Sequence, residues 1–498
     1  MSANSLRLAR VAAGLALALV ISPPIIHAQD YVNLSAADAA RLIREGQIRS
    51  QDLVAALLKQ IDAGSDLHAF ILIERDSAMR AARDADRKRE QGERLGPLHG
   101  VPIVIKDNIH LAGLPNTAGT PALRGFVPTD TAPVAQALID AGAIVLGKTN
   151  MHELALGITS NNAAFGPVVT PYDKGRFAGG SSGGTAAAIA ARMVPAGLGT
   201  DTGGSVRIPA ALNGIVGLRP TVGRYSQRGI TPLSHTRDTA GPMARTVRDL
   251  VLLDQVISGD ARPVRVADLG AVRLGVARIP FCQNIDREVA QILELALEKL
   301  RAAGVQVVDV ELPDLTDIYA KAGPPMAAYE VNADLGRYLA EYQTGLSVRA
   351  VVDQVASPDV KRLFETVILG EKAPSEAVYR DAVETHLPRL RQLYAETFAE
   401  RRLDALIFPT TPLPAQPLEQ SIETTLNGKT VSTFFTFLAN TRPSAFVHLP
   451  GLALPMGMTA DGLPVGIELD GPVGTDRRLL SIGLALESVL GPAPPPRR

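Results

Sequence analysis

After its N-terminal segment, the chain has apolar residues at helical spacing. Apolar side chains three and four residues apart line one side of a helix, and residues 34–61 follow this pattern twice. Ser35 is placed to cap the first predicted helix and Gly46 to end it, while Ser50 is placed to cap the second. Residues 78–91 are rich in Ala, Arg, Asp and Lys, which predicts a solvent-exposed helix.

Short apolar runs further along the chain predict buried strands. These runs are residues 100–105 (GVPIVI), 143–146, 404–409 (DALIFP) and 462–469 (GLPVGIEL). A helical pattern at residues 134–141 separates the first two of them. Strands that alternate with helices indicate an α/β fold. We therefore expect one large domain with a central twisted mixed sheet flanked by helices.

Three segments depart from this α/β pattern. Residues 262–400 are charged, helical in pattern and poorer in glycine, which predicts a helical insertion over one side of the sheet. Residues 491–498 are rich in proline and are expected to be disordered. Residues 1–28 have a basic start, an apolar run at 11–21 and a small residue at the cleavage position, the layout of a secretory signal peptide. We expect a mature domain at about 29–490, exported to the periplasm or secreted.

Charge and composition narrow the classes of partner. The 498 residues include 50 basic and 51 acidic ones. The resulting net charge of −1 does not indicate a basic surface for binding nucleic acid or an anionic membrane. Aromatic residues make up only 4% and Trp is absent, which argues against stacking of bases. Cys282 is the single cysteine, so an internal disulfide is excluded, and no Cys/His cluster has the spacing of a zinc site. This composition fits a protein that acts on a small-molecule substrate. The sequence does not determine the oligomeric state, and a homodimer is one possibility.

Three side chains in the glycine-rich centre offer nucleophilic chemistry. Lys106 follows an apolar run, and a lysine that is desolvated there loses its proton more easily and can act as a base. A serine hydroxyl needs such a base before it attacks a carbonyl group. Two serines are placed to be its partner: Ser181 lies in GGSSGG and Ser205 lies in DTGGSVRIP.

The residues around Ser205 suit the binding of a developing oxyanion. Two successive glycines let neighbouring backbone N–H groups converge on one point. The candidate donors are the N–H groups of Thr202, Gly203, Gly204 and Ser205. Asp201 and Arg207 flank this loop, where a bidentate ion pair between them would hold it in place.

Two motifs in the same region suggest other functions. Residues 142–149 (GAIVLGKT) match the P-loop pattern, but the residues that would form the phosphate-binding loop resemble a strand, so we reject this interpretation. Residues 179–183 match the nucleophile elbow of α/β-hydrolases, which would make Ser181 the nucleophile. That alternative requires a later triad histidine, and no recognisable triad context surrounds His235, His386 or His448.

The central segments resemble the amidase-signature family. Residues 179–221 match the family's signature nearly throughout, and residues 100–109 (GVPIVIKDNI) match its lysine motif. The spacing of Lys106, Ser181 and Ser205 agrees as well. The likeness extends over about residues 30–490 and includes the family-like segments 142–155, 404–415 and 449–469.

The resemblance implies a role for each candidate residue. Ser205 would be the nucleophile, Ser181 a bridging serine held by a cis peptide bond after Gly180, and Lys106 the base that finally takes the proton. Asp201, Arg207 and Gly180 would support the site. Ser205 would attack an amide carbonyl, ammonia or an amine would leave through Ser181, and water would cleave the acyl-enzyme. The resemblance implies no cofactor and no metal.

Within the family, the chain is most similar to the mandelamide and indoleacetamide hydrolase branch. This implies a primary aryl or arylacetamide-type amide as substrate, with an acid and ammonia as products. Carbamates, anilides and peptide C-terminal amides are alternatives, and so is an amidotransferase A-type glutaminase subunit, which the export signal disfavours. From position and apolarity, the expected pocket residues are Ile158, Phe165, Phe435 and Phe446.

Overall fold

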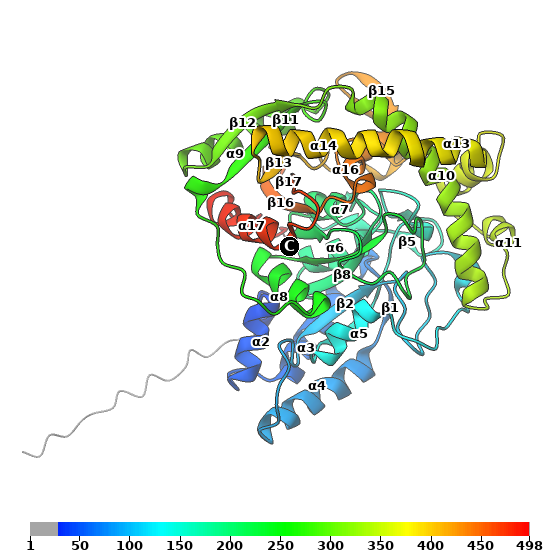
Figure 1. Ribbon diagram of the computed structural model, residues 1–498. Coiled ribbons are helices and arrows are strands. Elements are labelled where there is room, and N and C mark those ends of the chain that lie inside the picture. The colour runs from blue at the N-terminus through cyan, green and yellow to red at the C-terminus, as the bar shows by residue number, and fades with distance from the viewer. Residues whose placement is uncertain (1–27, 498) are drawn as a thin grey trace, which may run out of the picture.

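The computed structural model describes residues 28–497 and is built around one mixed sheet of 11 strands (Figure 1). The strands lie in the order β1-β3-β2-β8-β10-β9-β16-β17-β13-β11-β12. β2 is parallel to β3 and β8, β11 is parallel to β12 and β13, and the other pairs are antiparallel. The bounds are β1 Phe70–Ile73, β2 Pro102–Lys106, β3 Ile144–Thr149, β8 Ala196–Asp201, β9 Val216–Arg219, β10 Thr239–Ala244, β11 Arg273–Ile279, β12 Gln306–Glu311, β13 Ala405–Pro409, β16 Gly451–Met458 and β17 Pro464–Asp470.

Helices cover both faces of this sheet, so the predicted α/β class is confirmed. Successive residues of a strand point to opposite faces. In β16, Gly451 lies against Arg207 of α7, whereas Leu452 lies against Gly483 of α17, which places these two helices on opposite faces. The longer helices are α2 Ala36–Arg44, α3 Ser50–Ala63, α4 Arg75–Glu90, α5 Pro133–Asp140, α6 Gly183–Ala190, α8 Val247–Ser258, α9 Arg287–Ala302, α10 Leu315–Glu341, α14 Leu387–Arg401 and α17 Asp476–Leu490.

Shorter elements complete the described chain. Three two-stranded sheets pair β4 with β5, β6 with β7, and β14 with β15. Their bounds are β4 Asn161–Asn162, β5 Gly166–Pro167, β6 Val169–Thr170, β7 Asp173–Phe177, β14 Glu423–Leu426 and β15 Lys429–Ser432. The short helices are α1 Ala28–Tyr31, α7 Arg207–Leu212, α11 Val348–Asp353, α12 Pro358–Leu363, α13 Glu376–Asp381, α15 Thr433–Leu438 and α16 Arg442–Phe446.

The helical insertion predicted for residues 262–400 is shorter in the structure. Residues 273–311 form β11, α9 and β12, and the two strands extend one edge of the central sheet. Only the segment 315–401, from α10 to α14, is helical throughout its elements, and α10 and α14 lie over one end of the molecule (Figure 1). The sequence analysis missed β12 because this strand exposes much of its surface and lacks a long apolar run. The charged residues of α9 next to it made the whole region look helical.

The helix starts near the N-terminus agree in part with the predictions. Ser35 caps α2, since its hydroxyl accepts a hydrogen bond from Asp38 N at 3.0 Å. Ser50 does not cap α3; it is the first helical residue, and its hydroxyl donates to Gly100 O at 2.7 Å. The buried Asp86 carboxylate takes the capping role, accepting from Ser50 N at 2.7 Å and from Gln51 N at 3.0 Å.

The ends of the described chain bear on two further predictions. The predicted signal peptide lies outside the described residues except for Ala28, so export stays a prediction. Residues 491–497 form neither helix nor strand, and Pro494 O accepts a hydrogen bond from Tyr172 at 2.7 Å. Disorder of this tail in solution also stays a prediction. Among the described residues, no helix combines the length and apolarity needed to span a membrane.

Candidate active site

Two parallel neighbouring strands bring the candidate residues to one edge of the sheet. β2 ends at Lys106 and β8 ends at Asp201, and Ile105 of β2 pairs with Leu198 of β8. Because parallel strands end on the same side, Lys106 comes to lie beside the loop that follows Asp201. The turn that holds Ser181, just before α6, packs at the same edge, since Ser182 N donates to Ser205 O at 3.1 Å.

Lys106 is held by two hydroxyl groups. Its side chain is fully buried, and its Nζ donates to Ser181 Oγ and to Thr200 Oγ1, each at 2.7 Å. Thr200 also accepts from Asn108 Nδ2 at 3.1 Å, which fixes the threonine hydroxyl in turn. The amine is therefore aimed at Ser181 by strand geometry and by a second buried partner.

Burial decides the charge of Lys106. Loss of water disfavours the ammonium form, and this desolvation lowers the pKa of Lys106 to about 7, against smaller opposing effects of the Asp201 and Asp238 carboxylates. Neither carboxylate hydrogen-bonds the amine, whose partners are both neutral hydroxyls. Above pH 7 the amine is mostly neutral and can accept a proton.

Ser181 and Ser182 have different environments. The peptide bond between Gly180 and Ser181 is cis, as the resemblance implied, and the Ser181 hydroxyl faces Lys106. The Ser182 hydroxyl donates to Thr200 O and accepts from Thr200 N, both at 3.2 Å. Ser182 thus ties the turn to β8, and Ser181 is the serine in contact with the lysine.

Ser205 lies in the loop between β8 and α7 and lines a cavity. It is 7% exposed, whereas Ser181 is 0% exposed, so a ligand in the cavity reaches Ser205 first. Its hydroxyl forms no hydrogen bond with the described protein residues, which leaves it available to a substrate. In the structure, Lys106 is therefore hydrogen-bonded to Ser181 directly. Ser205 is linked to the turn that holds Ser181 through its backbone carbonyl, which accepts from Ser182 N.

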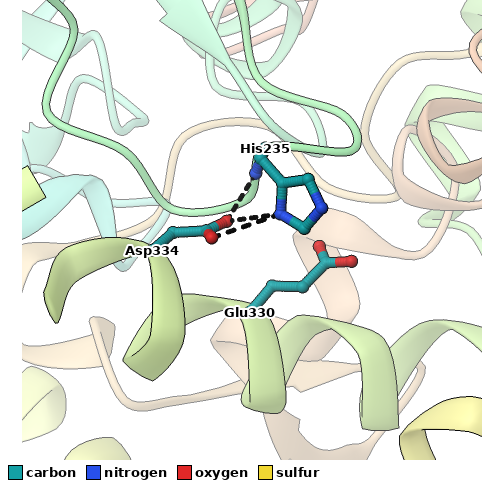
Figure 2. A group of neighbouring side chains, drawn as sticks. All are labelled: His235, Glu330 and Asp334. Carbon is teal, nitrogen blue, oxygen red and sulfur yellow. Dashed lines mark hydrogen bonds and ion pairs between the residues drawn. The ribbon is translucent and has the colours of Figure 1, made fainter. Parts of the chain in front are cut away.

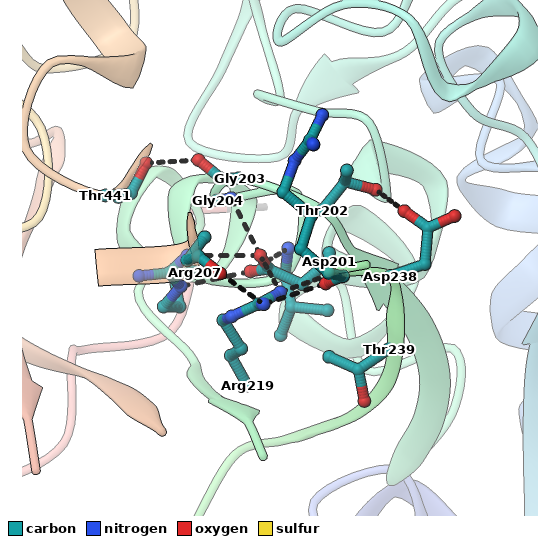
Figure 3. A network of polar contacts seen from close by, with 12 residues as sticks. Asp201, Thr202, Gly203, Gly204, Arg207, Arg219, Asp238, Thr239 and Thr441 are labelled. Atoms are coloured by element: carbon teal, nitrogen blue, oxygen red, sulfur yellow. Dashed lines mark hydrogen bonds and ion pairs between the residues drawn. The ribbon is translucent and has the colours of Figure 1, made fainter. Parts of the chain in front are cut away.

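The predicted oxyanion donors divide into two groups. Gly204 N donates to Asp201 Oδ1 at 2.8 Å, so this N–H group is already used and we remove it from the predicted set. Within the described chain, the N–H groups of Thr202, Gly203 and Ser205 have no protein acceptor. The Thr441 hydroxyl holds Gly203 O at 2.6 Å and fixes the loop from outside (Figure 3).

A buried ion network lies under this loop (Figure 3). Arg207 binds Asp201 in a bidentate manner, Nε to Oδ2 at 3.0 Å and Nη2 to Oδ1 at 3.1 Å, as predicted. Arg219 adds a second contact to Asp201 Oδ1 at 3.1 Å, and Glu468 of β17 pairs with Arg207. Burial alone would raise the pKa of Asp201, but the two guanidinium groups outweigh it and hold that pKa well below its usual range.

The substitution Arg207→Met is expected to lower the free energy of unfolding by about 3–5 kcal/mol. The variant leaves Asp201 and Glu468 buried with one cation fewer, and uncompensated buried charge is costly. A urea titration measures the change. The exposed Arg287, substituted in the same way, should change the free energy by less than about 0.5 kcal/mol. A loss below about 1 kcal/mol for Arg207→Met would contradict the structural role given to this network.

The cavity beside Ser205 has mainly apolar walls. Of the predicted pocket residues, Ile158 and Phe435 line it, and Phe435 is 61% exposed, so it belongs to the outer part. Phe165 and Phe446 do not line it; Phe446 is buried beneath the Arg237 guanidinium, 4.2 Å from its ring centre, and Phe165 stacks under Arg124. The other apolar lining side chains are Ala155, Leu156, Leu233, Pro324, Ala327, Ala328, Val331, Leu363, Val367, Ile368, Phe434 and Leu438.

The segment 315–401 supplies a wall that the sequence analysis missed. Val331 of α10, Leu363 of α12, and Ile368 just beyond it face the cavity together with Ser205. His152 helps to dock α12, because its Nε2 lies 3.0 Å from Asp359 Oδ2. Apolar residues at helical spacing in 315–341 were the only available signal, and they did not reveal which side of the sheet the helix would cover.

The later histidines of the nucleophile-elbow alternative do not reach Ser181. The Ser181 hydroxyl accepts a hydrogen bond from Lys106, and no described histidine side chain is hydrogen-bonded to it. His235 instead lies beside Glu330 and Asp334 of α10 (Figure 2), the one group of described residues whose distances would suit a metal ion. Each carboxylate already has an arginine partner, Arg237 for Glu330 and Arg337 for Asp334, so we interpret the group as a charged link to α10.

Comparisons with known proteins find similar chains over nearly the whole length of this one. The family model described as Amidase matches residues 52–480. The chain is 42% identical over 482 residues to mandelamide hydrolase of Pseudomonas putida, covering 93% of each chain. It is 42% identical over 458 residues to indoleacetamide hydrolase of Agrobacterium vitis, covering 92% of this chain and 97% of that one. A crystal structure of an amidase superposes with a TM-score of 0.81 at 35% identity, covering 92% of this chain and all of the other.

Proposed function

The chain belongs to the amidase-signature family, and from this premise we propose that it hydrolyses a primary aryl or arylacetamide-type amide to a carboxylic acid and ammonia. Its class, an amide hydrolase acting on linear C–N bonds, follows from the family. The observation that carries the mechanism is the 2.7 Å contact between buried Lys106 and Ser181 beside a cavity that Ser205 lines.

In the first half-reaction Ser205 forms an ester with the acyl group. Neutral Lys106 takes a proton from Ser181, which takes one from Ser205, and Ser205 Oγ attacks the amide carbon. The negative charge that develops on the carbonyl oxygen is bound by the free N–H groups of the 202–205 loop; one such donor is typically worth about 3 kcal/mol. The C–N bond then breaks, and the nitrogen leaves as ammonia after Ser181 returns a proton.

In the second half-reaction water cleaves the acyl-enzyme. Ser181 and Lys106 accept the water proton, the new tetrahedral centre uses the same N–H groups, and Ser205 leaves with a proton returned through Ser181. The amine at position 106 is thereby restored to its neutral form. Each half-reaction starts from an uncharged amine, which the lowered pKa of Lys106 provides near pH 7.

The choice of an aromatic acyl group rests on the cavity and on the relatives. The walls beside Ser205 are aliphatic and aromatic, which suits the burial of a ring. The two relatives at 42% identity are named for mandelamide and indoleacetamide, both of which carry an aromatic ring. Burial of a ring contributes to binding mainly through the apolar area removed from water.

A panel of amides is expected to rank the substrate classes. The purified protein should turn over phenylacetamide and indoleacetamide with kcat/KM at least about tenfold above that for hexanamide, for an anilide or for an alkyl carbamate. Such a ratio corresponds to about 1.4 kcal/mol of additional transition-state binding. Ammonia release, followed for each compound, measures the rates. Fastest turnover of the carbamate would overturn the proposed substrate class, although not the amidase family.

A further inference from the structure

Arg442 lies next to the loop that supplies the free N–H groups. It is the first residue of α16, and it lines the same cavity as Ser205 and Gly203. Its aliphatic stem packs on Gly203, where a Cβ atom would lie only 3.1 Å from Arg442 Cγ. A glycine at position 203 thus leaves room for the arginine stem, and the partly exposed Arg442 side chain forms part of the cavity wall beside Ser205.

The charge of Arg442 has no carboxylate partner within the described chain. Its guanidinium lies near the rings of Phe434 and Phe446, whose centres are 6.0 and 5.9 Å away, and it also interacts electrostatically with Arg237 and Tyr319. Arg237, the other cation in the cavity wall, is neutralised by Glu330 at 3.0 Å. The cavity walls therefore carry one unbalanced positive charge among apolar side chains.

We propose that Arg442 binds a carboxylate group of the substrate and so selects acyl groups that carry a second, anionic carboxyl group. A guanidinium group matches the geometry of a carboxylate through two parallel N–H donors. Apolar walls strengthen this pairing because they exclude competing water. Among mainly apolar walls, an unpaired cation is less well suited to a purely apolar ligand, since the ligand would remove water from the charge without replacing it.

This inference rests on the proposed function, which also determines where the carboxylate lies. A primary amide releases ammonia, which carries no carboxyl group. The anionic group must then belong to the acyl part, opposite the scissile C–N bond. The substrate class becomes the monoamide of a dicarboxylic acid with an aromatic body, such as a carboxyphenylacetamide.

Paired substrates test this role. We compare 3- and 4-carboxyphenylacetamide with the neutral acetylphenylacetamides of similar size, and take the ratio of kcat/KM within each pair. For the unchanged protein, at least one carboxylate should be favoured about tenfold or more, as expected for a charge-assisted hydrogen bond. Arg442→Gln should reduce this ratio by about tenfold or more, and Arg442→Lys should give an intermediate value. Because the ratio is internal to each variant, a general loss of activity does not affect it.

Arg287→Gln is the matched control, because Arg287 is an exposed arginine of α9 that does not line the cavity. It should keep the ratio of the unchanged protein. A ratio near one in the unchanged protein, or a ratio that Arg442→Gln leaves intact, would overturn the proposal. The first of these outcomes needs no variant, so the test stands even if Arg442→Gln does not fold.

A second, aliphatic pair separates this inference from the proposed function. Adipic acid monoamide and hexanamide differ in one terminal carboxyl group and contain no ring. If only aliphatic amides are hydrolysed, the aromatic substrate class is wrong, and the aliphatic ratio still reports on Arg442. If aryl amides are hydrolysed without preference for a carboxylate in either pair, the role of Arg442 is wrong and the proposed function stands.

Discussion

Replacing Ser205 with alanine lowers kcat/KM for phenylacetamide by about 10⁴-fold to 10⁶-fold, because the acyl-enzyme can no longer form. The residual rate comes from the N–H groups and from substrate binding, which the substitution leaves in place. Steady-state ammonia release at substrate concentrations around KM measures the loss.

The same variant should keep its stability. The Ser205 hydroxyl forms no hydrogen bond with the described residues, so its removal leaves no buried partner unsatisfied. We expect the midpoint of thermal unfolding to change by less than about 2 °C, in line with a small free-energy change. An active Ser205→Ala protein would remove this residue from the chemistry, and an unfolded one would show a structural role instead.

Substituting Lys106 with methionine lowers kcat/KM by about 10²-fold to 10⁴-fold, the usual contribution of a general base. In the unchanged protein the amine must be neutral, and its pKa lies at about 7. As the pH falls below 7, protonation blocks the base, so kcat/KM should fall about tenfold per pH unit. The variant should lack this acidic limb, because methionine does not titrate.

The exposed Lys299 of α9, changed to methionine, provides the control for this profile. It should preserve both the rate and the midpoint near pH 7. Retention of the acidic limb in Lys106→Met would assign it to another group, and turnover at the full rate would contradict the role of the amine.

The residues at the site could be predicted because local features of the sequence define them. Lys106 stands at the end of an apolar run, and such a run forms the buried strand β2. The glycines around Ser181 and Ser205 mark tight turns, one before α6 and one after β8, and the structure places these turns together. Asp201 and Arg207 are only six residues apart in the sequence, so their ion pair could also be predicted from local sequence.

The parts that could not be predicted depend on contacts between distant segments. Arg219 and Glu468 complete the ion network from β9 and β17, and nothing in their own neighbourhoods indicates a partner at Asp201 or Arg207. The acceptor of Gly204 N–H follows from the exact path of the loop rather than from residue type. The cavity wall from α10 and α12 depends on how the helical segment 315–401 docks on the sheet.

The central claim, that Ser205 is the nucleophile activated through Ser181 and Lys106, is tested most directly by locating a covalent adduct. The protein is treated with a fluorophosphonate, digested, and its peptides are mapped by mass spectrometry. We predict a phosphonate on Ser205 of the unchanged protein and no adduct in Ser205→Ala. An adduct on Ser181 of the unchanged protein, or undiminished labelling of Ser205→Ala, would contradict the mechanism.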